Sequence, residues 1–174
     1  MKFYSGIGSR ETPWEVCGHM TYLATILEDM GYTLRSGNAE GADQAFASGV
    51  EKNAQIWLPW DNFNRDFQDS HPKHTYITNK WEKESLGSVD EFHPAPEKLS
   101  VNGVLLMARN FRQIIGLNEP DSEFLICWTP RGEIRGGTGQ AIRIANSKQI
   151  PIYNMFNLTP NQILSEIEKR NLIM

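Results

Sequence analysis

Residues 32–58 read YTLRSGNAEGADQAFASGVEKNAQIWL, and this stretch decides the fold. Its first part, 32–35, predicts a short strand, and the glycine-rich turn 36–43 follows it. Apolar residues at helical spacing then predict a helix through about residue 53, and 55–58 predicts the next strand. A strand, a helix and a second strand joined by short turns form a crossover that places the two strands parallel in one sheet.

The same alternation of strands and helices extends on both sides of this unit. Further strands are predicted at 3–7, 124–128 and 150–153, and further helices at 14–30, 101–115, 138–147 and 160–169. Thr12 with Glu15, and Thr159 with Gln162, predict capping boxes at the starts of the first and last helices. We therefore expect one Rossmann-like domain over residues 1–174. Its core would be a doubly wound, mostly parallel five-stranded sheet with α-helices on both faces, an α/β fold.

Residues 60–98 interrupt this alternation. The segment is polar, contains Pro72, Pro94 and Pro96, and predicts an irregular insertion with short helices. Acidic residues are interleaved with its lysines, which favours a hydrophobic lid or a partner contact over a track for DNA. Stacking of a single adenine-like base is an alternative role for its aromatic side chains. The aromatic residues in and next to the segment are Trp57, Trp60, Phe63, Phe67, Tyr76 and Trp81.

The composition narrows the class of protein. With 40% hydrophobic and 22% charged residues, the chain has the balance of a folded globular protein. It has no run of about 18 apolar residues and no apolar signal segment, so we expect a cytoplasmic protein without a membrane contact. Cys17 and Cys127 lie in apolar segments and predict reduced, buried thiols. A net charge of −4 argues against a broad basic surface for nucleic acid, but it leaves room for a local basic pocket.

Three glycine-rich turns follow predicted strands. They read GIGSR at 6–10, SGNAEGAD at 36–43 and GGTGQ at 136–140. Because the carboxyl ends of parallel strands lie at one edge of a sheet, these turns are expected to meet where open α/β sheets bind ligands. Backbone N–H groups at helix starts bind anions, Arg10 adds a guanidinium group, and Thr138 adds a hydroxyl. The turns therefore predict a site for a phosphorylated ligand.

These motifs resemble those of the SLOG superfamily, which includes the Rossmann domain of DprA/Smf DNA-processing proteins and the LOG nucleotide phosphoribohydrolases. The resemblance lies in GIGSR at 6–10, RSGNAEGAD at 35–43, and GGTGQAIRIA followed by IPIYNM at 136–155. It covers most of the chain outside 60–98, and the SGxAxGAD form is particularly similar to DprA-like proteins. The resemblance implies a nucleotide-type ligand and a homo-oligomer. The turns and the resemblance together give these candidate ligand-binding residues: Gly6, Gly8, Ser9, Arg10, Ser36, Gly37, Asn38, Ala39, Gly41, Asp43, Thr129, Gly136, Gly137, Thr138 and Gln140.

The resemblance also bears on catalysis. Residues 107–110, Met-Ala-Arg-Asn, are similar to the LOG segment that carries a catalytic arginine, so Arg109 is the candidate catalytic residue if the protein is an enzyme. LOG enzymes also use a glutamate, and the equivalent position here is Arg143. Cleavage of an N-glycosidic bond needs a carboxylate. The acidic residues close to the expected site are Glu40, Asp43 and Glu133.

Three functions follow from these observations. The favoured one is a protein that senses or sequesters a phosphorylated nucleotide derivative, such as an ADP-ribose-type or cyclic nucleotide signal. The alternatives are a nucleotide N-glycosidase or phosphoribohydrolase of the LOG type, and a DprA-like accessory protein of recombination that binds single-stranded DNA. The favoured partner is thus a small molecule, and nucleic acid is less favoured. We expect no cofactor. We also expect no metal site, because Pro72 breaks the helical placement of His71 and His74.

Overall fold

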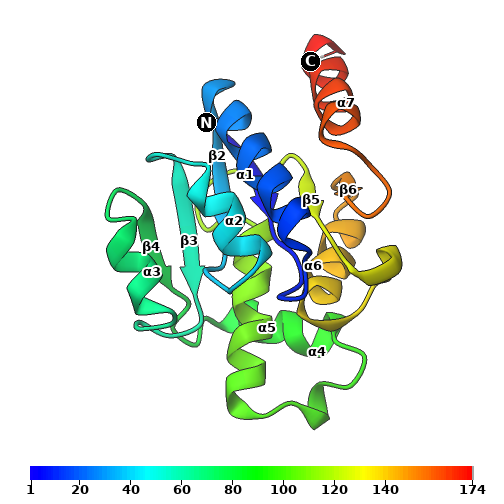
Figure 1. The fold of residues 1–174 in the computed structure, drawn as a ribbon. Helices are drawn as coiled ribbons and strands as arrows, with labels where there is room; N and C mark the ends of the chain where they lie inside the picture. Colours follow the sequence, from blue (N-terminus) through cyan, green and yellow to red (C-terminus); the bar gives the residue numbers. More distant parts are fainter. Residues whose placement is uncertain (174) are drawn as a thin grey trace.

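The computed structural model describes residues 1–173. In this range the chain folds around a six-stranded sheet with strand order β4-β3-β2-β1-β5-β6, and every pair of neighbours is parallel (Figure 1). The strands are β1 (Lys2–Gly6), β2 (Tyr32–Ser36), β3 (Ala54–Leu58), β4 (Thr75–Thr78), β5 (Leu125–Cys127) and β6 (Ile152–Asn154). The helices are α1 (Trp14–Asp29), α2 (Ala42–Ser48), α3 (Arg65–Ser70), α4 (Lys83–Phe92), α5 (Val101–Ile114), α6 (Gly136–Ser147) and α7 (Pro160–Ile173), with 3-10 turns η1 (Pro96–Lys98) and η2 (Pro130–Gly132). The predicted Rossmann-like α/β fold is confirmed.

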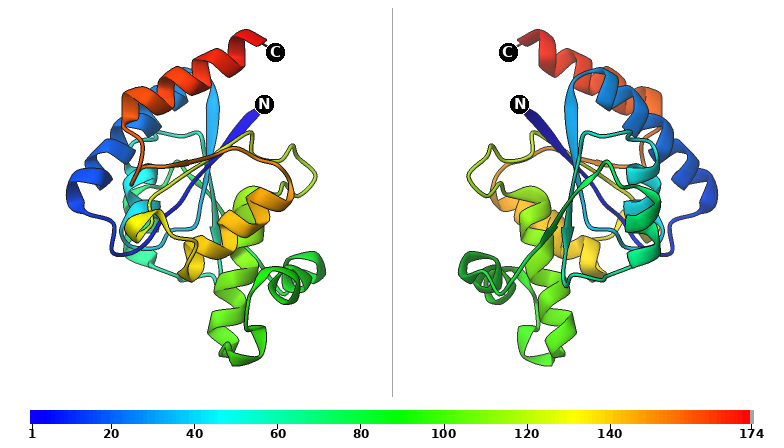
Figure 2. Two further views of the ribbon diagram at one scale, coloured as in Figure 1. Left: turned by 90° about the vertical axis from the view of Figure 1, so that its right-hand side faces the viewer. Right: turned by 90° about the vertical axis from the view of Figure 1, so that its left-hand side faces the viewer.

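Helices cover both faces of the sheet (Figure 2). Phe124 and Ile126 pack in one apolar cluster with side chains of α1, α2 and α7. Leu125 and Cys127 pack in a second cluster with α5 and α6. Successive side chains of a strand point to opposite faces, so a central parallel strand needs a continuous apolar run. This requirement explains why the run Phe-Leu-Ile-Cys forms an inner strand, with β1 on one side and β6 on the other.

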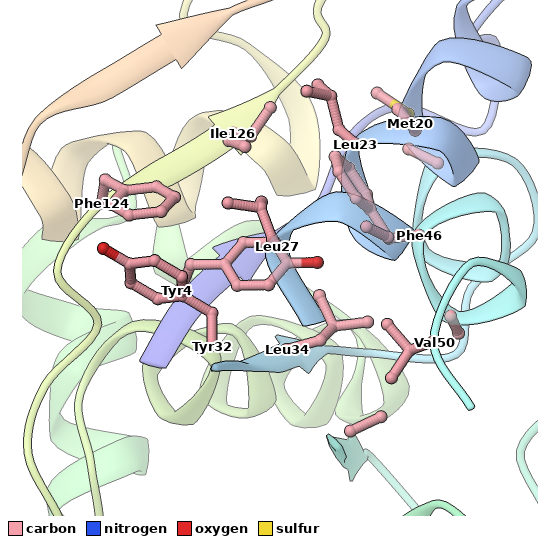
Figure 3. Close-up of a cluster of buried hydrophobic side chains, with 14 of the residues drawn as sticks. Tyr4, Met20, Leu23, Leu27, Tyr32, Leu34, Phe46, Val50, Phe124 and Ile126 are labelled. Carbon is pink, nitrogen blue, oxygen red and sulfur yellow. The ribbon is translucent and has the colours of Figure 1, made fainter. Parts of the chain in front are cut away.

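Aromatic rings fill the centre of the first cluster (Figure 3). The ring of Tyr4 from β1 stacks on that of Phe124, with 5.7 Å between centroids. Tyr32 from β2 meets Phe124 edge to face at 5.2 Å. Full burial of a large apolar side chain contributes about 1.5–3 kcal/mol, so these contacts hold β1, β2 and the start of β5 firmly in register.

Strand β4 corrects the expected strand number from five to six. It pairs only with β3, from Gln55 opposite Thr75 to Leu58 opposite Thr78. As an edge strand it has one neighbour, and none of its four residues is fully buried. The sequence TYIT therefore lacks a continuous apolar run such as that of β5.

The segment 60–98 contains the short helices that the sequence predicts there, but it is less irregular than expected because it also contains a strand of the sheet. It contains α3, β4, α4 and η1. Glu82 caps α4, because its carboxylate accepts hydrogen bonds from the backbone N–H groups of Glu84 and Ser85. The same carboxylate pairs at 2.8 Å with Arg112 of α5, whose side chain is 1% exposed. Part of what fixes this segment thus lies outside it, and the local sequence does not reveal it.

The aromatic side chains of this region mostly pack against the core rather than standing over the sheet as a lid. Trp57 and Phe63 are buried, and Trp60, Phe67 and Tyr76 are half-buried against the first cluster. Trp81 differs from them and is 58% exposed.

The two predicted capping boxes have different outcomes. At α7 the box is confirmed: the hydroxyl of Thr159 accepts from the N–H of Gln162 at 3.3 Å, and the Gln162 side chain accepts from the N–H of Thr159 at 2.9 Å. At α1 the prediction is wrong, because the Thr12 hydroxyl donates to the Ser9 carbonyl at 2.6 Å and does not cap the helix. The helix then begins at Trp14, whose side chain is 88% exposed.

Cys127 is buried in β5 and Cys17 is half-buried in α1, and both are free thiols. None of the helices in residues 1–173 has the length and apolar character to cross a membrane.

Candidate functional site

A cleft of about 410 Å³ opens at the carboxyl ends of the central strands. The loops after β1, β2 and β5 form its walls together with α5 and the start of α6. Strand β1 lies between β2 and β5. After β1 the chain adds β2, β3 and β4 on one side of it, and it then returns to add β5 and β6 on the other side. This is the switch point of strand order, where open α/β sheets bind their ligands.

The loop after β1 forms one wall and approaches its neighbours closely. A Cβ atom on Gly8 would lie 2.6 Å from the Cβ of Ala42, so no larger residue fits there without movement. Gly41 has a φ of 86° and packs against this loop, where a Cβ would lie 2.9 Å from the Ser9 carbonyl oxygen. Arg10 follows on the exposed side of the loop and lines the cleft. The two glycines therefore let the loop carry Arg10 to the mouth of the cleft.

Arg109 lies under the loop after β2 and is only 4% exposed. Its guanidinium group donates to the carbonyls of Gly37 and Trp57, and its Nε donates to the Asn110 side chain at 3.1 Å. Burial lowers the pKa of Arg109 to about 10, and the charge of Asp43 acts in the opposite direction. The group is thus a fixed, buried positive charge beside the cleft.

Asp43, in the first turn of α2, is the buried carboxylate of the cleft. It is 4% exposed, and its Oδ2 accepts from the backbone N–H of Ala39 at 3.2 Å. Burial raises the pKa of Asp43 to about 6, against the opposing effects of Arg109, the N–H groups of Ala39 and Gly8, and Arg10. At neutral pH this carboxylate balances part of the positive charge of the arginines.

The start of α6 supplies backbone donors. Its N-cap is Arg135, and no side chain caps the first turn. The first N–H groups of a helix lack partners within the helix and favour anions. Gly136, Gly137 and Thr138 of this turn line the cleft, and the Gly137 carbonyl is held by the Asn110 side chain at 3.0 Å. Together with Arg10 and Arg109, Arg135 brings a third guanidinium group to the cleft.

Most of the predicted site residues meet at this cleft. The residues that line it as predicted are Gly8, Ser9, Arg10, Ala39, Asp43, Arg109, Thr129, Gly136, Gly137 and Thr138. The hydroxyl oxygen of Thr129 accepts from Asn154 at 2.8 Å, which leaves its O–H as a donor.

The other predicted residues support the walls and do not line the cleft. A Cβ on Gly6 would lie 2.7 Å from the Phe46 ring, and the Ser36 hydroxyl donates to the Gly6 carbonyl at 2.6 Å. Gly37 has no room for a side chain beside Arg109. The buried side chain of Gln140 donates to the Ser88 carbonyl at 3.3 Å.

Asn38 also has a supporting role rather than the predicted binding role. Its side chain donates to the carbonyls of Phe63 at 2.8 Å and Asn64 at 3.2 Å. In return, the Asn64 side chain donates to the Asn38 carbonyl at 2.8 Å. Both residues have left-handed backbones, with φ of 63° and 50°. This reciprocal pair ties the loop after β2 to the loop after β3.

Sequence reasoning missed several lining residues. They are Ile7, Glu11, Leu106, Met107, Asn110, Gln113, Pro130 and Arg135. Four of them lie on α5 with the spacing of one helix face, from Leu106 to Gln113, and this spacing is the signal that could have found them. Residues Met107 and Asn110 lie within the segment compared with LOG enzymes, but only Arg109 was singled out there.

Of the three candidate carboxylates for glycosidic cleavage, the structure brings only Asp43 to the cleft. Glu40 is exposed and lies outside the lining, and Glu133 pairs with Arg131 at 2.7 Å on the surface. Arg143, at the position of the LOG glutamate, donates to the Phe92 carbonyl at 2.6 Å.

Two histidines, His71 and His74, have packing roles. His71 stacks between Phe67 and His74, and the His74 Nε2 lies 2.9 Å from the Val50 carbonyl oxygen. Residues 1–173 contain no group of three or more histidine, cysteine, aspartate or glutamate side chains placed to hold a metal ion.

The arrangement of strands, crossovers and cleft defines a Rossmann-like α/β protein with a cleft at its switch point that three arginines line. Among solved structures, the chain is similar to DNA processing protein A from Helicobacter pylori, whose structure describes a single-stranded DNA binding mode. The TM-score is 0.64 at 17% sequence identity, over 95% of this chain and 72% of that one. No protein-family model matches the sequence, and no curated protein matches it. At this identity the similarity establishes the shared fold.

Proposed function

We propose that the cleft binds single-stranded DNA and holds the phosphate of one nucleotide. The observation that carries this proposal is the convergence of Arg10, Arg109 and Arg135 with the first-turn amides of α6 on one cleft. Guanidinium groups and helix N-termini are the donors that bind phosphate in proteins. The Helicobacter pylori protein of the same fold binds single-stranded DNA, which supports a polymer as the ligand.

The cleft residues suit the parts of a nucleotide. Arg10 and Arg135 are exposed and can donate to phosphate oxygens, whereas buried Arg109 acts through its charge. Leu106 and Met107 offer apolar contact to a sugar or base. Thr138 adds a hydroxyl donor beside the amides of its own turn.

The net charge of −4 limits how DNA can bind. A strand that touches the protein only at this cleft would meet about two or three cations. Each phosphate contact with a single strand contributes about −0.7 to the slope of log K against log salt. Because the cleft holds one phosphate, we expect a shallow slope of about −0.7, much less than that of a protein with a broad basic surface.

A free phosphorylated nucleotide derivative is the second candidate ligand. A cleft of about 410 Å³ lies in the range of pockets that hold small molecules, about 300–1,000 Å³. A sensor or sequestering protein would bind such a ligand and release it unchanged. A hydrolase would release a base and a sugar phosphate, with Asp43 as its one cleft carboxylate that is buried.

The test compares a fluorescent 15-nucleotide single strand with mononucleotides, ADP-ribose and cyclic nucleotides. Anisotropy measures binding of the strand, and thermal shift with mass spectrometry of released molecules measures the small ligands. Arg10→Ala and Arg135→Ala should each weaken strand binding about tenfold or more and make the salt slope shallower. Lys148→Ala, an exposed charge at the other end of α6, is the matched control and should change neither.

The outcomes separate the candidates. Stabilisation by a small ligand, with no binding of the strand, would replace the DNA proposal by the second candidate. Recovery of that ligand as base plus sugar phosphate would identify a hydrolase. Loss of strand binding in Lys148→Ala equal to that in Arg10→Ala would show that binding is not at the cleft.

A further inference from the structure

A second hollow, of about 590 Å³, lies beside the cleft at the same edge of the sheet. Glu40 and Gln44 form one side, and residues between Asn62 and Ser70, at the start of α3, form the other. We call this hollow the polar groove. None of the functions predicted from the sequence uses it.

The polar groove and the cleft share one wall. Ala39 and Asp43 line the cleft, whereas the next residues in the chain, Glu40 and Gln44, line the polar groove. Ala39 and Asp43 are four residues apart, and so are Glu40 and Gln44. The loop after β2 and the first turn of α2 therefore have one side that faces the cleft and another that faces the polar groove. A helix is about 10 Å across, so a chain that leaves the cleft over this turn enters the polar groove with its next unit.

The polar groove is rich in hydrogen-bond acceptors. The side-chain amides of Gln44 and Asn64 donate to the Asn38 carbonyl at 3.3 Å and 2.8 Å, which leaves their oxygens to accept. Within residues 1–173 these two oxygens receive no hydrogen bond from the protein. The exposed carboxylates of Glu40 and Asp66 add further acceptors. Arg65 also lines the polar groove, but its Nε donates to the Asp69 carboxylate at 2.9 Å. With two exposed carboxylates and one paired guanidinium group, the polar groove favours a ligand that donates over a phosphate.

The bases of DNA are donors of this kind. Adenine presents its N6 amino group, cytosine its N4 amino group, and both pair with carboxylate or amide oxygens. The Phe67 ring, which already stacks on His71 with 4.2 Å between centroids, adds an apolar wall to the polar groove. Aromatic and apolar side chains are the usual partners of base faces in single-strand binding proteins.

We propose that the polar groove holds the base of a second nucleotide, one that carries an exocyclic amino group. This inference rests on the proposed function, because it takes the neighbouring nucleotide to be seated in the cleft. It makes the binding unit at least a dinucleotide. It also assigns Glu40 and Asn62, which the cleft does not use, to recognition of the base.

The experiment uses isothermal titration calorimetry with the dinucleotide pdApdA, the mononucleotide pdA and the dinucleotide pdTpdT. Glu40→Ala and Asn62→Ala remove exposed side chains at the polar groove and should leave the fold intact, which circular dichroism checks. Their matched controls are Glu168→Ala on α7 and Asn146→Ala on α6, both exposed and outside the lining of either hollow. We expect both groove variants to weaken pdApdA about fivefold to tenfold and to leave pdA unchanged.

Each outcome decides the inference. In the wild-type protein pdApdA should bind more tightly than pdA, and the preference for pdApdA over pdTpdT should shrink in Glu40→Ala. Unchanged pdApdA binding in both groove variants would overturn the inference while leaving the cleft proposal standing. Tighter pdApdA binding in Glu40→Ala would show that a phosphate, and not a base, lies next to the Glu40 carboxylate. Absence of binding to all three ligands would overturn both this inference and the proposed function, whereas Arg10→Ala should weaken pdA and pdApdA alike.

Discussion

Replacing Asp43 with asparagine should remove a pH dependence from the stability of the folded protein. Asp43 is 4% exposed, and burial raises its pKa from 3.8 to about 6. An acid with a higher pKa in the folded state than in the unfolded state takes up its proton more readily when folded. Its contribution to stability is therefore complete below about pH 4 and is lost as the pH rises through about 6.

The size of this effect follows from the two pKa values. A rise from 3.8 to about 6 corresponds to about 3 kcal/mol, at about 1.36 kcal/mol per pKa unit. About 2 kcal/mol of this should be lost between about pH 4.5 and about pH 8. Over the same range His74 acts oppositely, because burial lowers its pKa and favours the neutral ring in the folded state. A comparison of wild type with the variant cancels that contribution.

Urea unfolding followed by tryptophan fluorescence at five pH values across this range measures the free energy of unfolding. The difference between wild type and Asp43→Asn should change by about 2 kcal/mol, with wild type relatively more stable at the acid end. Asp29→Asn, which removes an exposed carboxylate at the end of α1, is the matched control for the loss of one negative charge. If the free energy of unfolding changed with pH by the same amount in wild type and in Asp43→Asn, this would refute the argument that ionisation of Asp43 destabilises the folded protein.

Three further changes test the packing around the site. Gly8→Ala should lower stability by about 1–3 kcal/mol and weaken DNA binding, because the new Cβ would lie 2.6 Å from the Cβ of Ala42. An unchanged midpoint of urea unfolding would contradict this close approach. Thr159→Ala should lower stability by about 1 kcal/mol through loss of the α7 cap. Faster amide hydrogen exchange confined to α7 would report this loss, and equal exchange in wild type and variant would argue against the capping box. Glu82→Ala should cost about 2 kcal/mol, because it removes a carboxylate partner from Arg112, which is 1% exposed. The double variant with Arg112→Met should recover part of that loss in thermal unfolding, and no recovery would show that the ion pair is not the cause.

The central part of the fold was predictable because its signals are local. Short apolar runs mark β1 and β5, and glycine-rich turns follow β1, β2 and β5. Strand β4 was missed, since an edge strand with half-buried side chains has no such run. Short helices were predicted for 60–98, but the position of α4 was not, because Glu82 and Arg112, thirty residues apart in the sequence, form the pair that fixes it.

The candidate site was predictable where backbone geometry decides it. The turns at 6–10, 36–43 and 136–140 each contribute to the cleft, as the glycine spacing indicated. Local sequence does not tell whether a polar turn residue faces a ligand or braces another loop. Asn38 was predicted to bind and instead holds Asn64. The α5 residues were missed because their spacing is equally typical of a face packed on a sheet.

The reciprocal bonds between Asn38 and Asn64 have a consequence for binding entropy. They join the loop that forms a wall of the cleft to one side of the polar groove, so a change in the shape of one hollow affects the other. The cost of ordering both loops is met during folding rather than when a ligand arrives. A DNA strand would therefore meet a surface already shaped for two successive nucleotides. Loss of the bonds of either asparagine should slow the binding of both nucleotides together.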